Sequence, residues 1–246
     1  MEPFIAATID AMQEIAALLR ENDDDSLFYP AKEGDEGIGY GGDRSLRIDL
    51  IAEDIFIDRL SRFGRVNSEE RGLFGEGADE IVIDPIDGSA NLASGIPYYG
   101  AAVSLKRDGK PLHSIICNLA NGDCFVKSLS DSYRRNLRSP QKKPLARNLK
   151  PLAGIFEKAY SHPKTAATLR KNGFKFRSPG ALALSLAYAR DVSFTLAIGR
   201  SREYDIIAGL HLCEDVYRFV SEKLIIVSAD LAVFERLKSI FVEGKE

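Results

Sequence analysis

Apolar residues recur at helical spacing in two stretches near the start of the chain. In residues 4–20 the 3.6-residue period predicts an amphipathic helix, with apolar positions at Ile5, Ile9, Met12, Ala16 and Leu19. A second helix is expected at about 44–63, with apolar positions at Ile48, Ile51, Ile55, Leu60 and Phe63. Between them, residues 33–43 hold five glycines and four acidic residues. We expect a mobile loop there, of the kind that closes over a site.

Short β-rich runs bounded by turn residues predict an antiparallel sheet in the next part of the chain. An extended piece is expected at 65–67, and a strand at 80–84 that ends at Asp84 because Pro85 follows. Asp108-Gly109 and Asn121-Gly122 are typical hairpin turns. They join further strands that we expect at 98–106, 112–118 and 122–128.

Strands and helices alternate in the second half, which is typical of an α/β layer. Strands are expected at 152–156, 174–177, 192–198 and near 216–227, and helices at 163–172, 180–190, 203–213 and 229–241. The segment 133–150 carries seven lysines and arginines and two prolines. We expect a solvated connector there; a nucleic-acid arm is the alternative, although only Tyr133 offers a stacking ring. The predicted subdomains are 1–145 and 146–246.

Composition places the chain among ordinary globular proteins. It has 246 residues, of which 45% are hydrophobic and 28% are charged. No apolar run approaches the roughly 20 residues of a membrane span, so no membrane partner is expected. The first residues, Met-Glu-Pro-Phe, do not begin a secretory signal, and we expect a cytoplasmic location. A net charge of -3 does not favour nucleic acid as a partner.

Cysteines and histidines narrow the metal chemistry. Cys117, Cys124 and Cys213 are odd in number and show no CxxC spacing, so three thiols are expected rather than a disulfide framework or a zinc site. The three histidines form no HxxxH pair. A bound metal would therefore have oxygen ligands, which favours a hard cation such as Mg²⁺.

The run from Asp84 to Ser89, Asp-Pro-Ile-Asp-Gly-Ser, is the main candidate for chemistry. Two carboxylates three residues apart leave an apolar strand, and a carboxylate there needs a partner. Gly88 permits a sharp turn, and Ser89 is expected to cap a short helix whose N–H groups face an anion. Divalent cations between the carboxylates and that anion would reconcile the charges. An ordinary Asp-Gly turn after a strand is the alternative.

Two other acidic features are expected to converge on this run. Glu69-Glu70 follows the extended piece 65–67, and strands that are adjacent in sequence often pair, so Glu69 is expected beside Asp84. Asp205 lies in the first turn of a predicted helix. Each has a plain alternative: a solvated Glu-Glu pair, and an Asp that the helix dipole favours.

These segments resemble a known family. The run Asp84–Ser89, followed by Asn91, Gly95 and Pro97, resembles the first signature of the inositol monophosphatase family of magnesium-dependent, lithium-sensitive phosphatases. Its relatives include fructose-1,6-bisphosphatases and nucleotide 3′-phosphatases. Weaker likenesses follow the family order, at Asp43–Asp49, Ser68–Glu70, Gly180–Leu184 and Tyr204–Gly209.

The resemblance implies a layered αβαβα sandwich of the sugar phosphatase type, a homodimer, and two or three Mg²⁺ ions, with Mn²⁺ as the alternative. The first ion would be held by Glu69, Asp84 and the carbonyl of Ile86, and the second by Asp84, Asp87 and Asp205. Asp49, Glu69 and the Ser89 hydroxyl would position the water. The substrate would contact Asp87, Gly88, Ser89, Gly180, Ala181 and Asp205.

The implied activity is hydrolysis of a small phosphorylated polyol or sugar, either inositol monophosphate or fructose 1,6-bisphosphate. Ile198 stands where inositol-specific members carry a Glu, and Arg200 and Arg202 could meet a second phosphate; surface solvation is the alternative. A nucleotide 3′-phosphatase is a second candidate, although Ser-Ala-Asn-Leu after Gly88 fits it less well than Thr-Lys-Glu-Phe. A non-catalytic binding protein on the same fold is a third. A calcium-binding module is not expected, because no DxDxDG loop is present.

Overall fold

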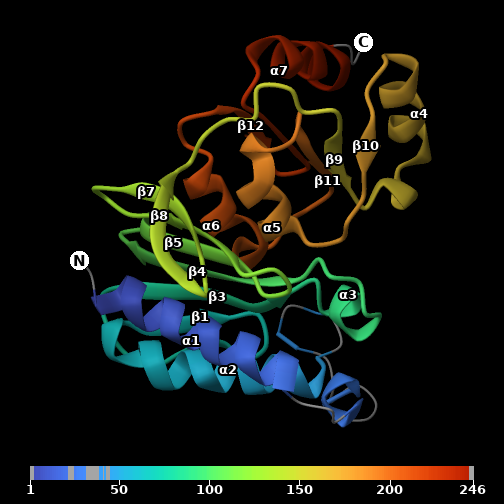
Figure 1. Ribbon diagram of the computed structural model, residues 1–246. Coiled ribbons are helices and arrows are strands. Elements are labelled where there is room, and N and C mark those ends of the chain that lie inside the picture. The colour runs from blue at the N-terminus through green and yellow to red at the C-terminus, as the bar shows by residue number, and fades with distance from the viewer. Residues whose placement is uncertain (1–2, 22–24, 32–38, 41, 43–44, 244–246) are drawn as a thin grey trace.

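Helices and sheets alternate in layers through the molecule (Figure 1). The structure is a computed structural model that describes residues 3–21, 25–31, 39–40, 42 and 45–243. One outer layer holds α1 (Pro3–Glu21) and α2 (Arg47–Leu60), which pack on the first sheet. The central layer holds α5 (Leu182–Ala187) and α6 (Glu203–Leu212), and α4 (Pro163–Lys171) and α7 (Leu231–Lys238) lie outside the second sheet. The αβαβα prediction is therefore confirmed.

The first sheet contains eight strands of the described chain in the order β2-β1-β3-β4-β5-β6-β7-β8. In chain order they are β1 (Arg65–Ser68), β2 (Gly72–Phe74), β3 (Glu80–Asp87), β4 (Gly100–Arg107), β5 (Lys110–Asn118), β6 (Asp123–Lys127), β7 (Ser132–Asn136) and β8 (Ser139–Pro144). Neighbours are antiparallel except β1 and β3, which are parallel. Asp108 and Gly109 have φ of 50° and 74°, the conformation of a type I′ turn, as their sequence predicts.

Strand β3 does not end at Asp84 as predicted. It continues through Pro85 to Asp87, with all eight residues buried, and its register against β4 shifts between Asp84 and Asp87. Proline cannot donate to the ladder, and such an irregularity is where a sheet accommodates it. Both carboxylates therefore project from the strand itself.

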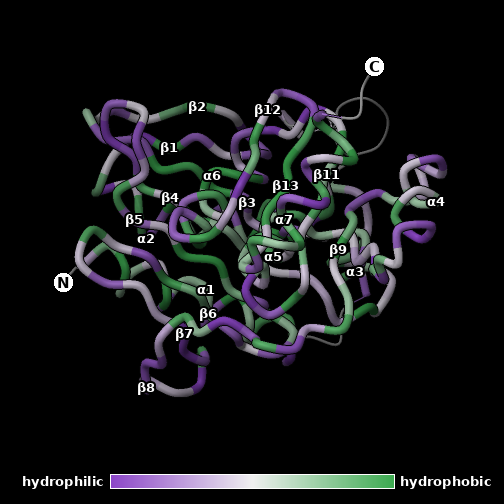
Figure 2. The backbone as a smooth tube through the Cα atoms, turned by 90° about the horizontal axis from the view of Figure 1, so that it is seen from above, coloured by the Kyte–Doolittle hydropathy of each residue, from purple (hydrophilic) through white to green (hydrophobic). Residues whose placement is uncertain are grey.

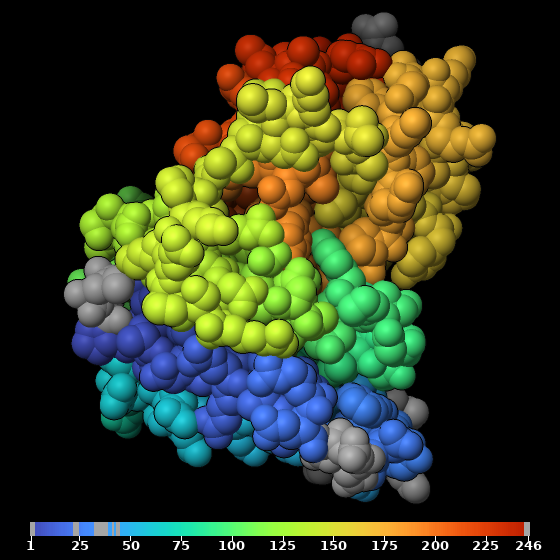
Figure 3. Space-filling model, viewed as in Figure 1, coloured from blue at the N-terminus to red at the C-terminus, as the bar shows by residue number. Residues whose placement is uncertain are grey.

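The basic segment is not a connector over its first part. Residues 132–144 form the β7–β8 hairpin at the sheet edge, and Arg134 pairs with Asp123 and Asp191 while its guanidinium lies over the Phe125 ring. Figure 2 shows the hairpin projecting as a hydrophilic loop. The chain after β8 then runs over the surface toward the second half, as the yellow segment in Figure 3 shows.

The second sheet has five strands of the described chain in the order β10-β9-β11-β13-β12. They are β9 (Gly154–Glu157), β10 (Phe176–Arg177), β11 (Thr195–Ile198), β12 (Tyr217–Ser221) and β13 (Leu224–Ser228). The first three in that order are parallel and the others antiparallel. Ala183 and Ala208 of the central helices pack against Ala102 and Ile116 of the first sheet. The division at 145/146 stays a prediction, since α5 and α6 of the second half pack on the first sheet.

Short helical pieces connect these elements. The helix α3 spans Ser89–Ala93, single 3₁₀ turns stand at Asp25–Phe28, Ser61–Phe63, Ala159–Ser161 and Tyr188–Arg190, and a π turn ends the described chain at Ser239–Glu243. Most of the loop expected at 33–43 lies outside the described residues. No helix in the described ranges is long and apolar enough to cross a bilayer.

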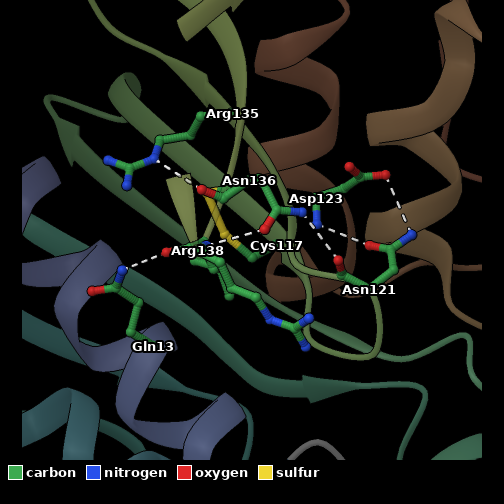
Figure 4. The surroundings of a disulfide bond; sticks show 9 residues. Gln13, Cys117, Asn121, Asp123, Arg135, Asn136 and Arg138 are labelled. Atoms are coloured by element: carbon green, nitrogen blue, oxygen red, sulfur yellow. Dashed lines mark hydrogen bonds between the residues drawn. A yellow bond between two sulfur atoms is a disulfide. The ribbon is translucent and has the colours of Figure 1, made fainter. Parts of the chain in front are cut away.

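The expectation of three thiols is wrong for two of the cysteines. Cys117 of β5 and Cys124 of β6 form a disulfide (Figure 4), and Cys213 is free and buried. The two bonded residues stand directly opposite each other in an antiparallel pair, with a Cα–Cα distance of 4.1 Å. Spacing along the chain does not reveal such a pair, because the hairpin register brings the side chains together.

Gly209 allows α6 to approach α5 closely, and a side chain there is expected to destabilise the fold. An ideal Cβ at Gly209 would lie 2.5 Å from the Leu186 Cβ. We expect Gly209→Ala to lower the free energy of unfolding by about 1–3 kcal/mol through overpacking, measured by urea unfolding. In an open helix the same change stabilises by roughly 1 kcal/mol, so a gain in stability would contradict this close packing.

Candidate functional site

Two carboxylates come together where β1 ends beside its parallel neighbour β3. Ser68 pairs with Ile83 in the ladder, and the N–H of Glu69 donates to the carbonyl of Ile83 at 3.2 Å. Glu69 and Asp84 therefore leave the sheet side by side. This is the pairing that the order of the strands in the sequence predicts.

A third carboxylate reaches the same point from the second half. Asp205 lies in the first turn of α6, the helix that packs on the first sheet. Carboxylate oxygens of Glu69, Asp84 and Asp205 all lie within 4.8 Å of one another. The structure thus brings three of the predicted ligands into one cluster.

Asp84 is the most deeply buried member of the cluster. Its exposed fraction is 2%, and its Oδ1 is buried without a hydrogen-bond partner among the described residues. Burial raises the pKa of its carboxyl well above the ordinary value, and the charges of Glu69, Asp87 and Asp205 raise it further. A buried oxygen with no donor is costly. An oxygen-only donor set with such an atom fits a hard divalent cation.

Asp87 lines the same cavity but is oriented differently. Its Oδ2 accepts the N–H of Leu184 at 2.8 Å, and its carboxyl is outside the three-carboxylate cluster within the described chain. Burial raises its pKa well above the ordinary value, and the neighbouring carboxylates add to the effect. Ile86, whose backbone carbonyl is another predicted metal ligand, also lines the cavity. A second ion at Asp87 therefore stays a prediction.

The turn after β3 opens the first turn of α3. Gly88 has φ 87° and holds the N-cap position, a conformation that favours glycine. Ser89 is the first helical residue, and no side chain of the described chain caps α3. The prediction that Ser89 is the cap is wrong: Gly88 takes that position, and Ser89 lines the cavity instead.

Asp49 projects from α2 into the cavity. It is 3% exposed, its Oδ2 accepts the N–H of Leu46 at 2.7 Å, and its buried Oδ1 has no hydrogen-bond partner in the part of the chain that is described. Burial raises its pKa to about 8, and the charges of Glu70 and Glu69 contribute. Asp49 is therefore held close to the carboxylate cluster in a form that can carry a proton near neutral pH.

The cavity has a volume of about 600 Å³ and lies between the two halves of the chain. Most of the predicted site residues line it: Asp49, Glu69, Asp84, Ile86, Asp87, Gly88, Ser89, Gly180 and Asp205. Ala181 does not line the cavity among the described residues. Its side chain is 1% exposed and lies behind the turn, 3.0 Å from where a Cβ of Gly88 would be. A substrate contact by Ala181 stays a prediction.

Sequence reasoning missed Glu157, Lys158 and Tyr160, which also line the cavity. The Glu157 carboxylate accepts the N–H of Gly180 at 2.9 Å and the hydroxyl of Ser185. It therefore fixes the turn that forms one wall. The missed signal is a carboxylate that ends an apolar strand, Gly154–Glu157, the same pattern that singles out Asp84.

The two arginines near α6 have different environments. Arg202 pairs with both Glu69 and Asp205, whereas Arg200 has a side chain that is 83% exposed and pairs with Glu222 at 3.2 Å. Ile198 lines the cavity at the end of β11. An apolar side chain there cannot accept hydrogen bonds from substrate hydroxyls.

Known proteins share both the sequence pattern and the fold. A sequence model described as the inositol monophosphatase family matches residues 1–216. A fructose-1,6-bisphosphatase/inositol-1-monophosphatase of Archaeoglobus fulgidus is 30% identical over 199 residues, 76% of this chain and 74% of that protein. One from Thermococcus kodakarensis is 38% identical over 93 residues, 37% of this chain and only 36% of that protein. The extragenic suppressor protein suhB from Bartonella henselae has a similar structure, with TM-score 0.78, 19% identity and coverage of 99% of this chain and 100% of that one.

Proposed function

This chain belongs to the inositol monophosphatase family of phosphatases, and from that membership we propose that it hydrolyses a phosphate monoester of a small polyol or sugar with the help of Mg²⁺. The observation that carries the proposal is the cluster of Glu69, Asp84 and Asp205, in which the buried Oδ1 of Asp84 has no hydrogen-bond partner among the described residues. The proposed hydrolysis needs no histidine, because bound divalent ions lower the pKa of water and stabilise the attacking and leaving oxygens.

Each group of residues in the cavity has its own proposed role in the reaction. Glu69, Asp84, Asp205 and the Ile86 carbonyl would hold the ions, with Asp87 on the second. Asp49 and the Ser89 hydroxyl would orient the attacking water. The N–H groups of Gly88 and Ser89 would bind the phosphate at the start of α3, and Gly180 would contact the alcohol part. All of these residues line one cavity, which supports a single reaction site.

One residue of the cavity wall supports a choice between the candidate substrates. Ile198 lines it, and this favours a sugar phosphate over an inositol phosphate as the better substrate. The test is phosphate release from inositol 1-phosphate, fructose 1,6-bisphosphate and a nucleotide 3′-phosphate, each with Mg²⁺ and with EDTA. We expect Mg²⁺-dependent release from at least one of the first two. Release from the nucleotide alone would favour a 3′-phosphatase, and no release from any would favour a binding protein.

Loss of the Ser89 hydroxyl is expected to slow turnover without disturbing the fold. Ser89→Ala removes a group that positions water and relays its proton, so kcat is expected to fall by about 10²–10⁴, measured by phosphate release. The matched control is Ser89→Thr, which keeps the hydroxyl and is expected to retain most of the activity. Equal losses in both variants would show that packing at α3, and not the hydroxyl, matters.

Two further expectations stay predictions. The resemblance implies a homodimer, and the sequence favours a cytoplasmic location. Light scattering on the purified protein measures the first.

A further inference from the structure

Arg202 lies against two of the three clustered carboxylates. Its Nε donates to the Asp205 Oδ2 at 3.0 Å and its Nη2 to the Asp205 Oδ1 at 3.1 Å, which is a bidentate pair. The same Nη2 lies 2.7 Å from the Glu69 Oε1. The guanidinium therefore joins a carboxylate at the end of β1 to one at the start of α6.

The position of Arg202 is set by the helix that carries Asp205. Arg202 is the N-cap residue of α6, and its backbone N–H donates to the Asp205 Oδ2 at 3.2 Å. Its guanidinium also lies over the Tyr204 ring, 5.5 Å from the centroid. The side chain is 31% exposed and lines the cavity, so it has room to move away from the carboxylates.

We propose that Arg202 is an internal counter-ion of the carboxylate cluster, which a divalent cation displaces from Glu69 and Asp205 so that the guanidinium turns to the anionic group of the substrate. This inference rests on the proposed function, because it needs the cluster to bind a divalent ion. It concerns a step that comes before chemistry: the exchange of one cation for another at the same oxygens.

Competition for oxygen lone pairs explains why the exchange is required. The Asp205 oxygens and the Glu69 Oε1 contact Arg202, while the same groups belong to the ion cluster. A divalent ion needs close, unobstructed oxygens, so it has to move the guanidinium. Arginine always carries its charge, and its fork of N–H groups matches phosphate as well as carboxylate. The displaced side chain therefore gains a new partner when a phosphorylated substrate enters.

The exchange also orders the binding events. Before the ion binds, Arg202 is held by carboxylates and is a poor ligand for an anion. After the ion binds, the same positive charge faces the cavity. Substrate anion binding is thus expected to depend on prior metal binding, and the two affinities are coupled through one side chain.

The first test measures Mn²⁺ binding by isothermal titration calorimetry in wild type, Arg202→Gln and the matched control Arg200→Gln. We expect Arg202→Gln to lower the Kd for Mn²⁺ by about tenfold or more, because no cation has to be displaced. Arg200→Gln should leave the Kd within about twofold, since Arg200 pairs with Glu222. The metal-free Arg202→Gln variant should melt at a lower temperature than wild type and show a larger rise in melting temperature with Mn²⁺.

The second test measures inorganic phosphate binding to the Mn²⁺-saturated proteins. We expect phosphate to bind at least about tenfold more weakly to Arg202→Gln than to wild type. Unchanged or weaker Mn²⁺ binding in Arg202→Gln, in a variant that still unfolds cooperatively, overturns the inference while leaving the phosphatase proposal standing. Failure of all three proteins to bind Mn²⁺ overturns both.

Discussion

Asp84→Asn is expected to abolish Mg²⁺-dependent phosphate release and, at the same time, to stabilise the metal-free protein. Asp84 is the member of the cluster that would touch both ions, and asparagine removes its charge while keeping its shape. We expect activity to fall by at least about 10³, the upper end of the loss for one electrostatic group, because Asp84 would hold the ions themselves. The measurement is phosphate release at saturating Mg²⁺, with Mn²⁺ calorimetry as the second readout.

The stability effect has the opposite sign for a physical reason. Burial and neighbouring carboxylates raise the pKa of Asp84, so at neutral pH the metal-free fold must either bury the charge or take up a proton that the unfolded chain has released, and both lower its stability. A neutral amide avoids both and can donate to the oxygens of Glu69 or Asp205. We expect a gain of about 1–2 kcal/mol in the free energy of unfolding in EDTA.

A matched control is available just before the same strand. Asp79 pairs with Arg107 at 2.6 Å, and this pair lowers the pKa of Asp79. Asp79→Asn is expected to leave activity within about twofold and to give no stabilisation, since it removes a favourable charge. Near-normal turnover in Asp84→Asn, or an equal activity loss in both variants, would contradict the assigned metal site.

The elements with a clear period or turn signal were predictable from the sequence. The helical spacing before residue 63 gave α1 and α2, and Asp108-Gly109 gave the turn between β4 and β5. The β7–β8 hairpin was not found because an edge hairpin exposed to solvent can be built from charged residues, so its composition is that of a connector. Pro85 predicted that the strand ends at Asp84. Only the pairing of β3 with β4 shows that the strand accommodates this proline through an irregularity.

The candidate site was predictable where it depends on local order and strand pairing. Glu69 and Asp84 could be placed together because the two strands expected from the sequence at 65–67 and 80–84 are neighbours in the sheet. The bridge from Arg202 to Glu69 could not be predicted, because it depends on how α6 docks on the first sheet. The same holds for Glu157, whose role depends on the turn at Gly180 that packs against Gly88.

In the metal-free protein, Asp49 is expected to make stability fall as pH rises. Its pKa is about 8 in the fold against 3.8 ordinarily, so between these values the unfolded chain has released a proton that the fold still holds. Raising the pH therefore favours unfolding across this window, and the loss from Asp49 alone is on the order of 5 kcal/mol. The pKa values of Asp84 and Asp87 are raised as well, so these two groups make the free energy of unfolding fall more steeply with pH.

The substitution Asp49→Asn separates the pH dependence due to Asp49 from that due to Asp84 and Asp87. The amide keeps an acceptor for the Leu46 N–H but has no charge to bury, so the variant should match wild type near pH 4 and exceed it in stability at pH 8, measured by urea unfolding in EDTA. Asp54 is an exposed residue of the same helix and pairs with Arg71. Asp54→Asn should have the same dependence of unfolding free energy on pH as wild type. If the free energies of unfolding of wild type and Asp49→Asn changed with pH in parallel, Asp49 would not hold a proton in the fold. Because Asp49 would also help to orient the attacking water, Asp49→Asn should lower kcat by about 10²-fold, so the same substitution that stabilises the metal-free fold at pH 8 should impair the enzyme.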